Sequence, residues 1–402
     1  MATNFIWTGA GADGLWNNPA NWSPSGIPST ADTAFIPLGV SVLSSNDSIS
    51  GLGNQGVLGV AQGSYLRLKG TINNSGTILF DAGGNNYIGI DASLGTATLT
   101  GGGDVRLSAD TSRITAHNYT GGTLTNQDNT IRGFGYINSG FNFVNNGAVN
   151  ADVSGKTLRI ISSTTGTGSY TASNGGTLQI EGTVSGGVFN GPGSGGTVWS
   201  ANGTVINSAN QGVLGVASGS NSYLRLAGTI NNTGTILFDA GGNNYIGIDA
   251  SLGTATLTGG GDVRLSADTA RITAHNYTGG TLTNQDNTIR GFGYINNNFN
   301  FVNNGAVNAD VSGHTLRILT PNFVNTGTLA ATNGGTLNVA GSYAQSAGVT
   351  RVADGSTILV GTVPSPGTHY DQRWPARRLG HHYRECHQFR HDRGGKFRRR
   401  DA

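Results

Sequence analysis

The sequence predicts an all-β fold: a parallel β-solenoid over residues 41–366, with an N-terminal cap over residues 1–40 and an irregular C-terminal tail over residues 367–402. Three observations support this. The chain of 402 residues contains 67 Gly and only 11% charged residues, so helix formers are few and residues suited to strands and tight turns are many. Short apolar runs recur between turns rich in Gly and Asn, and a long stretch of sequence occurs twice.

The N-terminal segment differs from the rest of the chain in its tryptophan content. Trp7, Trp16 and Trp22 fall within the text WTGAGADGLWNNPANWSPSGIPSTADTAFI, whereas only two tryptophans follow in the remaining chain. The open edge of a solenoid promotes aggregation unless another segment covers it. We therefore predict that residues 1–40 pack over the first coil. The alternative is that the three rings form an exposed platform on which sugars stack.

The body of the chain contains a recent duplication. Residues 70–138 and 228–296 are identical at all but two of 69 positions, and the similarity extends to about residues 55–160 and 211–318. The two differences are Ser75 against Thr233 and Ser112 against Ala270. The offset between the copies is 158 residues. We name residues 55–160 copy 1 and residues 211–318 copy 2.

A shorter repeat lies inside each copy. The pattern Asn-x-Gly-[Thr/Ala]-[Ile/Leu/Val] recurs as NNSGTI, NNGAV and NTGTL, at a spacing of about 20–30 residues that is typical of solenoids. Each unit contains a strand of about four to six residues, and residues 65–68 alternate between outward and apolar inward positions. One coil cannot bury its own apolar face, so the coils are expected to stack. Asparagines at equivalent turns can adopt left-handed conformations and hydrogen-bond along the stack.

Charge and cysteine content exclude several classes of function for the body. Residues 1–364 hold 13 Lys and Arg against 17 Asp and Glu, a net charge of −4, so no basic stripe for nucleic acid is expected. The only cysteine, Cys386, lies in the tail, which excludes a disulfide framework or a thiolate metal site in the body. No apolar run reaches the roughly 18 residues that would span a bilayer, and the first residues do not have the pattern of a signal peptide.

The tail has a different composition. Residues 365–402 hold 10 Lys and Arg against 4 Asp and Glu, a net charge of +6, and the repeats are absent. One interpretation is a basic arm for nucleic acid or acidic surfaces. We favour a reading-frame error, because one permitted choice of codons from His369 onward, translated one base later, continues the solenoid pattern as far as a TNSGTI unit. A frameshifted tail is expected to be disordered.

Carboxylates are the most plausible catalytic residues, since some β-helices cleave polysaccharides with paired carboxylates. The body contains one Glu, Glu181, and 16 Asp. Asp81, Asp91, Asp104 and Asp110 recur in the second copy as Asp239, Asp249, Asp262 and Asp268. A catalytic cleft has little need for two identical copies, whereas Asp is a common turn residue. We therefore predict structural roles for them and assign no catalytic residue.

Histidine and arginine positions do not indicate a bound metal or cofactor. His117 and His275 occupy one repeat position, and His314 stands where copy 1 has Lys156. None has metal-ligand spacing, so we expect exposed positions on the solenoid and predict neither a metal site nor a cofactor site. Arginines alternate with apolar residues and are expected to face solvent. These are Arg67, Arg106, Arg132 and Arg159, with their duplicates.

The N-terminal pattern also resembles a known family. The arrangement of Trp7, Trp16, Asn21, Trp22, Pro28 and Asp32, followed by Asn-x-Gly-Thr coils, looks like the start of bacterial autotransporter-type (type V secretion) passenger regions. The resemblance covers about residues 5–366. It implies a single-stranded right-handed β-helix, display at the cell surface or outer membrane or release outside the cell, and frequent roles in adhesion. The signal sequence and C-terminal translocating β-barrel of this family are not found in the sequence. We expect the barrel outside it, and for the signal two alternatives stay open: the chain is not secreted as given, or its true start lies upstream.

These observations predict a non-enzymatic, adhesin-like passenger segment that is surface-exposed or secreted. Its repeating face would contact host or matrix glycans or proteins, or further copies of the chain, but not nucleic acid. Two alternatives stay open. A β-helix polysaccharide lyase or hydrolase would have a groove with at least two non-duplicated carboxylates. A structural component of the cell surface or a biofilm matrix would self-associate.

Overall fold

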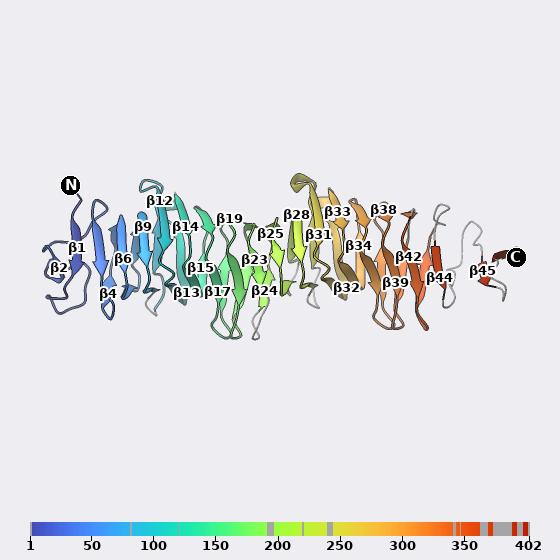
Figure 1. Cartoon of the computed structure of the whole chain (residues 1–402), viewed down its shortest axis with the longest axis horizontal. Coiled ribbons are helices and arrows are strands. Elements are labelled where there is room, and N and C mark those ends of the chain that lie inside the picture. The colour runs from blue at the N-terminus through green and yellow to red at the C-terminus, as the bar shows by residue number, and fades with distance from the viewer. Residues whose placement is uncertain are drawn as a thin grey trace.

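The structure, a computed structural model, is an all-β solenoid whose coils stack along one axis, with β1 (Asn4–Trp7) at one end and β42 (Val349–Val352) towards the other (Figure 1). It describes residues 2–80, 83–119, 121–190, 197–218, 221–238, 244–340, 343–345, 347–361, 369–372, 388–391 and 397–400. Forty-four strands form one continuous sheet, and the described pairings in it are parallel except between β1 and β2 (Trp22–Ser23). The fold class predicted from the sequence is therefore confirmed.

The strands form three parallel stacks, which we name faces 1, 2 and 3. Face 1 contains β1, β3 (Thr33–Ile36), β6 (Gly51–Asn54), β9 (Gly70–Asn74), β12 (Thr96–Thr100), β14 (Thr123–Asn126), β16 (Asn142–Asn145), β19 (Thr164–Thr165), β22 (Thr183–Ser185), β25 (Gly203–Ile206), β30 (Tyr245–Ile248), β37 (Thr315–Ile318), β40 (Thr336–Val339) and β43 (Thr357–Val360). Face 2 contains β4 (Ser41–Ser44), β7 (Val57–Val60), β10 (Thr77–Phe80), β17 (Ala148–Ala151), β20 (Ser169–Ala172), β23 (Val188–Asn190), β26 (Ala209–Asn210), β31 (Thr254–Thr258), β33 (Thr281–Asn284), β35 (Asn300–Asn303), β38 (Asn322–Asn325) and β41 (Tyr343–Gln345). Face 3 contains β5 (Asp47–Ile49), β8 (Tyr65–Leu68), β11 (Tyr87–Ile90), β18 (Thr157–Ile160), β21 (Thr177–Ile180), β24 (Thr197–Ser200), β27 (Val213–Val216), β29 (Thr235–Phe238), β36 (Ala306–Ala309), β39 (Thr328–Ala331), β42 and β44 (His369–Gln372).

Five longer strands bend round a corner and belong to two faces. They are β13 (Asp104–Ala116) and β15 (Thr130–Ile137), from face 2 to face 3, β28 (Tyr223–Asn232), from face 1 to face 2, and β32 (Asp262–Ala274) and β34 (Thr288–Asn296), from face 3 to face 1. The register between β13 and β15 shifts between Ser108 and Arg113, where the chain turns the corner. Four 3-10 turns are the only helical elements among the described residues: η1 (Pro19–Asn21), η2 (His117–Tyr119), η3 (Ala250–Leu252) and η4 (His275–Tyr277).

The coil length varies more than the sequence predicts. Strand partners lie 16 residues apart between Val198 and Leu214, and 27 residues apart between Thr77 and Asp104. Within each coil, every second strand residue points inward, as the burial pattern of β15 shows. The inward residues build one continuous apolar core, because Leu, Ile, Val and Phe stack on their counterparts from coil to coil.

Buried asparagines form two internal hydrogen-bonded ladders, one where face 1 meets face 2 and one where face 2 meets face 3. On face 1, Asn54 donates to Asn74 over 2.7 Å, Asn74 to Asn129 over 2.8 Å, and Asn126 to Asn145 over 2.8 Å. A second ladder on face 2 joins Asn210, Asn232, Asn287, Asn284, Asn303 and Asn325. All these side chains are fully buried, and the ladders satisfy most of their polar atoms, leaving the Oδ1 of Asn54 and of Asn210 without a partner at the first rungs.

The predicted hydrogen bonding of asparagines along the stack is confirmed. The asparagines that form these hydrogen bonds are not, however, the ones that adopt the left-handed conformation. The ladder asparagines do not have positive φ, whereas turn asparagines such as Asn174 (φ 51°) and Asn333 (φ 54°) do. The turn positions lie at corners where a left-handed residue is needed, and Asn tolerates that conformation better than most residues.

The tryptophans of the N-terminal segment pack against each other. Trp22 contacts Trp7 and Trp16 edge to face, with ring centroids 5.0 and 4.8 Å apart, and the Nε1 of Trp22 donates to the Trp16 carbonyl over 2.7 Å. All three are at least 94% buried. Asn21, also buried, donates to Asp13 and to the Leu15 carbonyl, which holds this loop against the first coils. The rings therefore do not form an open platform for sugars.

The second copy of the duplication begins on a different face from the first. The VLGV strand of copy 1 is β7, which stacks between β4 and β10 on face 2. The VLGV strand of copy 2 is β27, which stacks between β24 and β29 on face 3. Each later pair of twin strands keeps this displacement, so an offset of 158 residues corresponds to a whole number of turns plus one face.

The tail contributes three described strands. β44 pairs in parallel with β42 and so adds a rung to face 3, and β45 (Gln388–His391) pairs antiparallel with β46 (Phe397–Arg400) in a separate sheet. Residues 362–368, 373–387, 392–396 and 401–402 lie outside the described residues. The proposed frame error, the disorder of the tail and the right-handedness of the coil stay predictions.

Candidate functional site

The most distinctive surface feature of copy 1 is a row of outward side chains on face 3. Tyr65, Tyr87, Arg113, Tyr136 and Arg159 are direct register partners on five successive strand positions. All five are half-buried, so their outer edges reach solvent. Neighbouring strands lie about 4.8 Å apart, so the five positions span roughly 19 Å. We name these residues the copy 1 row.

Copy 2 carries the same row on face 1. Tyr223, Tyr245, Arg271, Tyr294 and Arg317 are again direct register partners. They form the copy 2 row. Because the twin strands lie on different faces, the two rows are not collinear but occupy neighbouring faces of the solenoid.

Aromatic and cationic groups cover each other's faces within each row. The Arg113 guanidinium lies 5.2 Å from the Tyr87 ring centroid, and that of Arg159 lies 4.9 Å from the Tyr136 centroid. On its other side, Tyr87 packs against Tyr65 at 5.6 Å. The rows therefore present phenol hydroxyls and guanidinium edges to solvent, while most of the ring faces are occupied.

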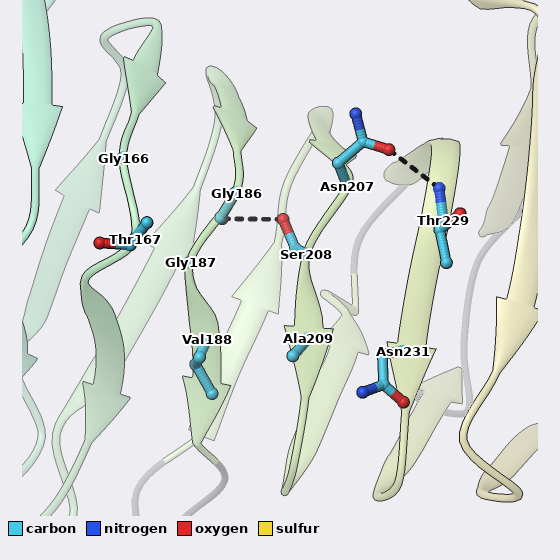
Figure 2. A pocket seen from close by; sticks show the side chains of 10 residues that line it. All are labelled: Gly166, Thr167, Gly186, Gly187, Val188, Asn207, Ser208, Ala209, Thr229 and Asn231. Atoms are coloured by element: carbon cyan, nitrogen blue, oxygen red, sulfur yellow. Dashed lines mark hydrogen bonds between the residues drawn. The ribbon is translucent and has the colours of Figure 1, made fainter.

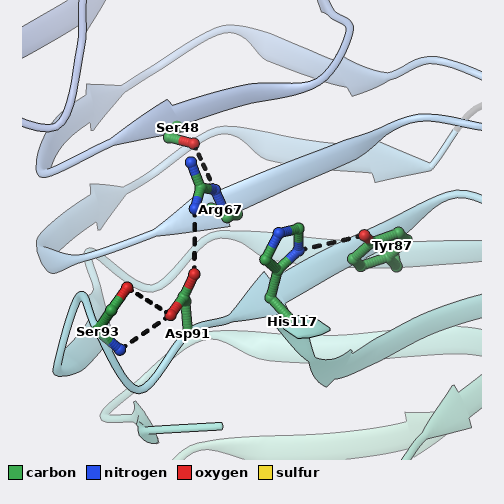
Figure 3. Close-up of polar contacts among 6 residues, drawn as sticks. All are labelled: Ser48, Arg67, Tyr87, Asp91, Ser93 and His117. Carbon is green, nitrogen blue, oxygen red and sulfur yellow. Dashed lines mark hydrogen bonds and ion pairs between the residues drawn. The ribbon is translucent and has the colours of Figure 1, made fainter. Parts of the chain in front are cut away.

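A histidine–aspartate–arginine cluster flanks the start of the copy 1 row (Figure 3). Arg67 pairs with Asp91 over 3.0 Å and donates to Ser48 over 2.7 Å. Asp91 also accepts from the backbone and hydroxyl of Ser93, over 2.9 and 2.7 Å. His117 lies 3.2 Å from the Tyr87 hydroxyl through Nδ1.

The expected exposure of His117 and His275 is wrong. Their side chains are only 7% and 6% exposed, because each folds back over a glycine of the neighbouring strand. A Cβ on Gly89 would lie 3.2 Å from both the His117 Cβ and the Arg67 Cγ, and Gly247 has the same surroundings in copy 2. The missing side chain at these positions provides the space that the imidazole fills.

The electrostatics of the cluster follow from this packing. Burial, with the nearby Arg67, lowers the pKa of His117, so the imidazole stays neutral at neutral pH. Hydrogen bonds from Ser93 outweigh burial and lower the pKa of Asp91, which stays ionised opposite Arg67. Burial raises the pKa of Tyr87, so its hydroxyl remains a hydrogen-bond donor.

A strained turn places an exposed tyrosine beyond each histidine. Asn118 and Tyr119 both have positive φ, at 51° and 65°, and the twin pair in copy 2 has the same conformation. Tyr119 is 98% exposed and Tyr277 is 83% exposed. Consecutive non-glycine residues in this region are costly and are often found at functional sites.

The remaining candidate residues of the sequence analysis serve mainly as bridges between coils. Arg132 pairs with Asp104 over 3.2 Å and with Asp152, and Arg290 pairs with Asp262 and Asp310 over 2.8 and 3.2 Å. Lys156 pairs with Asp110 over 2.9 Å, and His314 lies 3.6 Å from Asp268 at the twin position. Arg106 is exposed, as expected. Asp81 and Asp239 lie outside the described residues.

The two rows differ at their last arginine. Arg159 pairs with Glu181, which follows the next strand of face 3, whereas Ala340 occupies the matching position after β40 in copy 2. Among the residues that the structure describes, Arg113, Arg271 and Arg317 have no ion pair. The copy 2 row therefore holds two unneutralised guanidinium groups and the copy 1 row holds one.

A shallow groove of about 470 Å³ lies between the copies (Figure 2). It is lined by Gly166, Thr167, Gly186, Gly187, Val188, Asn207, Ser208, Ala209, Thr229 and Asn231. Ser208 donates to the Gly186 carbonyl over 2.8 Å, and Asn207 accepts from the Thr229 amide over 3.0 Å. Gly166 and Gly186 follow β19 and β22 where the face 1 ladder has asparagines, so the groove marks the place where that ladder stops.

Within the described ranges, no group of three or more His, Cys, Asp or Glu side chains is arranged to hold a metal ion. In the same part of the chain, no helix has the length and apolar character needed to cross a membrane. Comparison with known proteins found no matching family model and no matching curated protein.

Proposed function

We propose that this β-solenoid is a non-enzymatic passenger segment of a bacterial adhesin-like protein that is displayed at the cell surface or secreted. The observation that carries the proposal is the pair of outward rows. Each copy presents a straight outward row of tyrosine and arginine side chains, and such a row offers an extended partner several contact groups in succession.

The ion pairing of the carboxylates supports a binding role over a catalytic one. Asp91, Asp104 and Glu181 each pair with an arginine of a neighbouring coil. An ion-paired carboxylate is held in its charged form and is poorly suited to act as a general acid. These residues therefore fit a role in fastening coil to coil.

The N-terminal segment supports surface display. The tryptophans and Asn21, which carry the resemblance to autotransporter-type passengers, all lie in the packed segment at the first coils. A solenoid also suits this role, because it extends a regular surface away from its point of attachment.

Surface display can be tested in the source bacterium. An antiserum raised against the purified chain should label intact wild-type cells or the culture medium, but should not label a strain that lacks the gene. The deletion strain should also attach less well to polysaccharide-coated surfaces. Labelling only after the cells are permeabilised would contradict the proposal.

Sequencing the gene across codon 369 and both flanks supplies an independent check. A restored frame that continues Asn-x-Gly-Thr coils, with an export signal upstream, would agree with the proposal. Glycan cleavage by the purified chain would instead favour a polysaccharide lyase or hydrolase, and concentration-dependent assembly of the chain would favour a matrix component.

A further inference from the structure

We propose that the copy 1 and copy 2 rows are two separate binding sites for an acidic polysaccharide, a linear glycan that carries carboxylate groups along its chain. The inference rests on the proposed function, since it names the ligand class of an adhesin-like surface. Its evidence is the geometry and charge of the ten row residues.

The shape of the rows fits a linear polymer. Each row is straight because its members are register partners on stacked strands, and it spans roughly 19 Å along the solenoid axis. A ligand with groups repeating along its length can contact several row residues at once. Weak contacts then add along the row, as in multivalent binding.

The chemistry of the outer edges selects an anionic ligand. Guanidinium groups bind carboxylates through paired N–H donors, and Arg113, Arg271 and Arg317 have no carboxylate partner among the described residues. The hydroxyls of Tyr87 and Tyr245 already contact a histidine, and each keeps acceptor capacity for a sugar hydroxyl. The exposed rings of Tyr119 and Tyr277, beyond the histidines, add one open aromatic face near the start of each row.

The same packing disfavours single-stranded nucleic acid. Proteins that bind such strands offer open aromatic faces on which successive bases stack. Here the faces of Tyr87 and Tyr136 are covered by Arg113 and Arg159. Charge-assisted hydrogen bonds to an acidic glycan use the edges that are left exposed.

Because the rows lie on neighbouring faces, one chain can hold two polysaccharide strands at the same time. The surface would then cross-link acidic polymers and not simply coat one of them. Copy 2 is the stronger site, because Glu181 neutralises Arg159 in copy 1 while Ala340 leaves Arg317 free.

The test uses the full purified chain and calorimetric titration with a long oligogalacturonate. The matched control ligand is the methyl ester, which has the same backbone but lacks the negative charges. We expect two oligomers bound per chain and little binding of the ester. The variants are Arg113→Ala with Tyr87→Ala for copy 1, and Arg271→Ala with Tyr245→Ala for copy 2.

Each double variant should retain one bound oligomer, and the combined variant should retain none. Each single Arg→Ala change should weaken its own site about tenfold, as expected for loss of a charge-assisted hydrogen bond. Circular dichroism and thermal unfolding establish that the variants fold, and Arg106→Ala, an exposed arginine outside the rows, should bind like the wild type.

Three results would overturn the inference: equal binding of the ester, binding unaffected by the row variants, or row-dependent binding of oligo(dT) without binding of oligogalacturonate. These results leave the proposed function untouched if the chain is still found at the cell surface and still promotes attachment. Conversely, a chain that binds oligogalacturonate through its rows but stays inside the cell would contradict the proposed function alone.

Discussion

Copies 1 and 2 share nearly all of their sequence but not their place in the solenoid. The row of copy 1 lies on face 3 and that of copy 2 on face 1, since the 158-residue offset does not correspond to a whole number of turns. The contacts inside each copy are reproduced, as the twin clusters of His117 and His275 show. The contacts at the copy ends are not, as Glu181 and Ala340 show. The duplication therefore preserves the contacts within each row, but it changes the face on which the row lies and the net charge at its last arginine.

The largest expected effect is a loss of local stability when a ladder asparagine is replaced, and it should be equal in the two copies. Asn126 donates to Asn145 and to the Asn129 carbonyl, and Asn284 makes the same contacts with Asn303 and Asn287. Asn126→Ala and Asn284→Ala should each lower local stability by about 2–3 kcal/mol, because buried polar partners lose their hydrogen bonds.

Hydrogen exchange measured on peptides around each site reports this loss locally, which suits a stack that need not unfold in one step. Thr125→Ala, at the outward neighbouring position, is the control and should change little. A large effect in one copy alone would show that the copies are not structurally equivalent.

The second prediction rests on a difference in burial between the twin carboxylates Asp152 and Asp310. Arg132 neutralises Asp152, whose side chain is 4% exposed, while its twin Arg290 neutralises Asp310, which is 15% exposed. Arg132→Ala should cost about 1–3 kcal/mol and Arg290→Ala should cost less, because the more buried carboxylate suffers more from losing its partner. Chemical denaturation of both variants beside Arg106→Ala measures the difference, and a larger loss for Arg290→Ala would contradict it.

The third prediction concerns the carboxylate of Glu181, which pairs with the last arginine of the copy 1 row and has no counterpart in copy 2. Glu181→Ala should strengthen oligogalacturonate binding at copy 1, and Ala340→Glu should weaken it at copy 2, each by about three- to tenfold. Titration in backgrounds where the other row is inactivated isolates each site. If neither exchange alters affinity, Arg159 and Arg317 do not contact the ligand.

The smallest effect concerns pH. Burial lowers the pKa of His117 and of His275 in the folded chain, so the unfolded chain binds a proton more readily. Their contribution to stability is therefore present above an unfolded pKa of about 6.5 and is lost as the pH falls through that value towards the folded pKa. The unfolding temperature should drop between about pH 7.5 and pH 5, and the double variant His117→Gln, His275→Gln should flatten this dependence. An unchanged slope in the variant would assign the drop to other groups.

Much of the fold could be predicted from the sequence, whereas the rows could not. The turn pattern and the duplication predict stacked coils, and Tyr65-Leu66-Arg67-Leu68 shows alternation directly. The alignment of Tyr65, Tyr87 and Arg113 depends on coils of 22 and 26 residues, and coil length elsewhere falls to 16. Strands such as β13 and β28 also run across corners, so the face of a residue cannot be counted from the sequence.

The burial of His117 cannot be predicted from the sequence for a related reason. Its sequence context, ITAHNYTGG, resembles an exposed turn, and the glycine that accommodates the imidazole lies 28 positions earlier, at Gly89. An outward glycine in an alternating strand is a useful indication of such a close approach.

A disulfide test can determine on which face of the solenoid copy 2 begins. Trp199 lies on β24, the last face 3 strand before copy 2, and Gly215 lies on β27, the first strand of copy 2. The two residues are register partners. In a Cys386→Ser background, Trp199→Cys with Gly215→Cys should oxidise to an intramolecular disulfide, detected by mass spectrometry of the digested chain. Trp199→Cys with Arg225→Cys, which places the second thiol on face 1, should stay reduced. If copy 2 began on face 2 as copy 1 does, the strand that carries Arg225 would lie on face 3 beside Trp199, as the strand of Arg67 does in copy 1. A disulfide in this second pair with free thiols in the first would therefore contradict the displacement of copy 2 by one face.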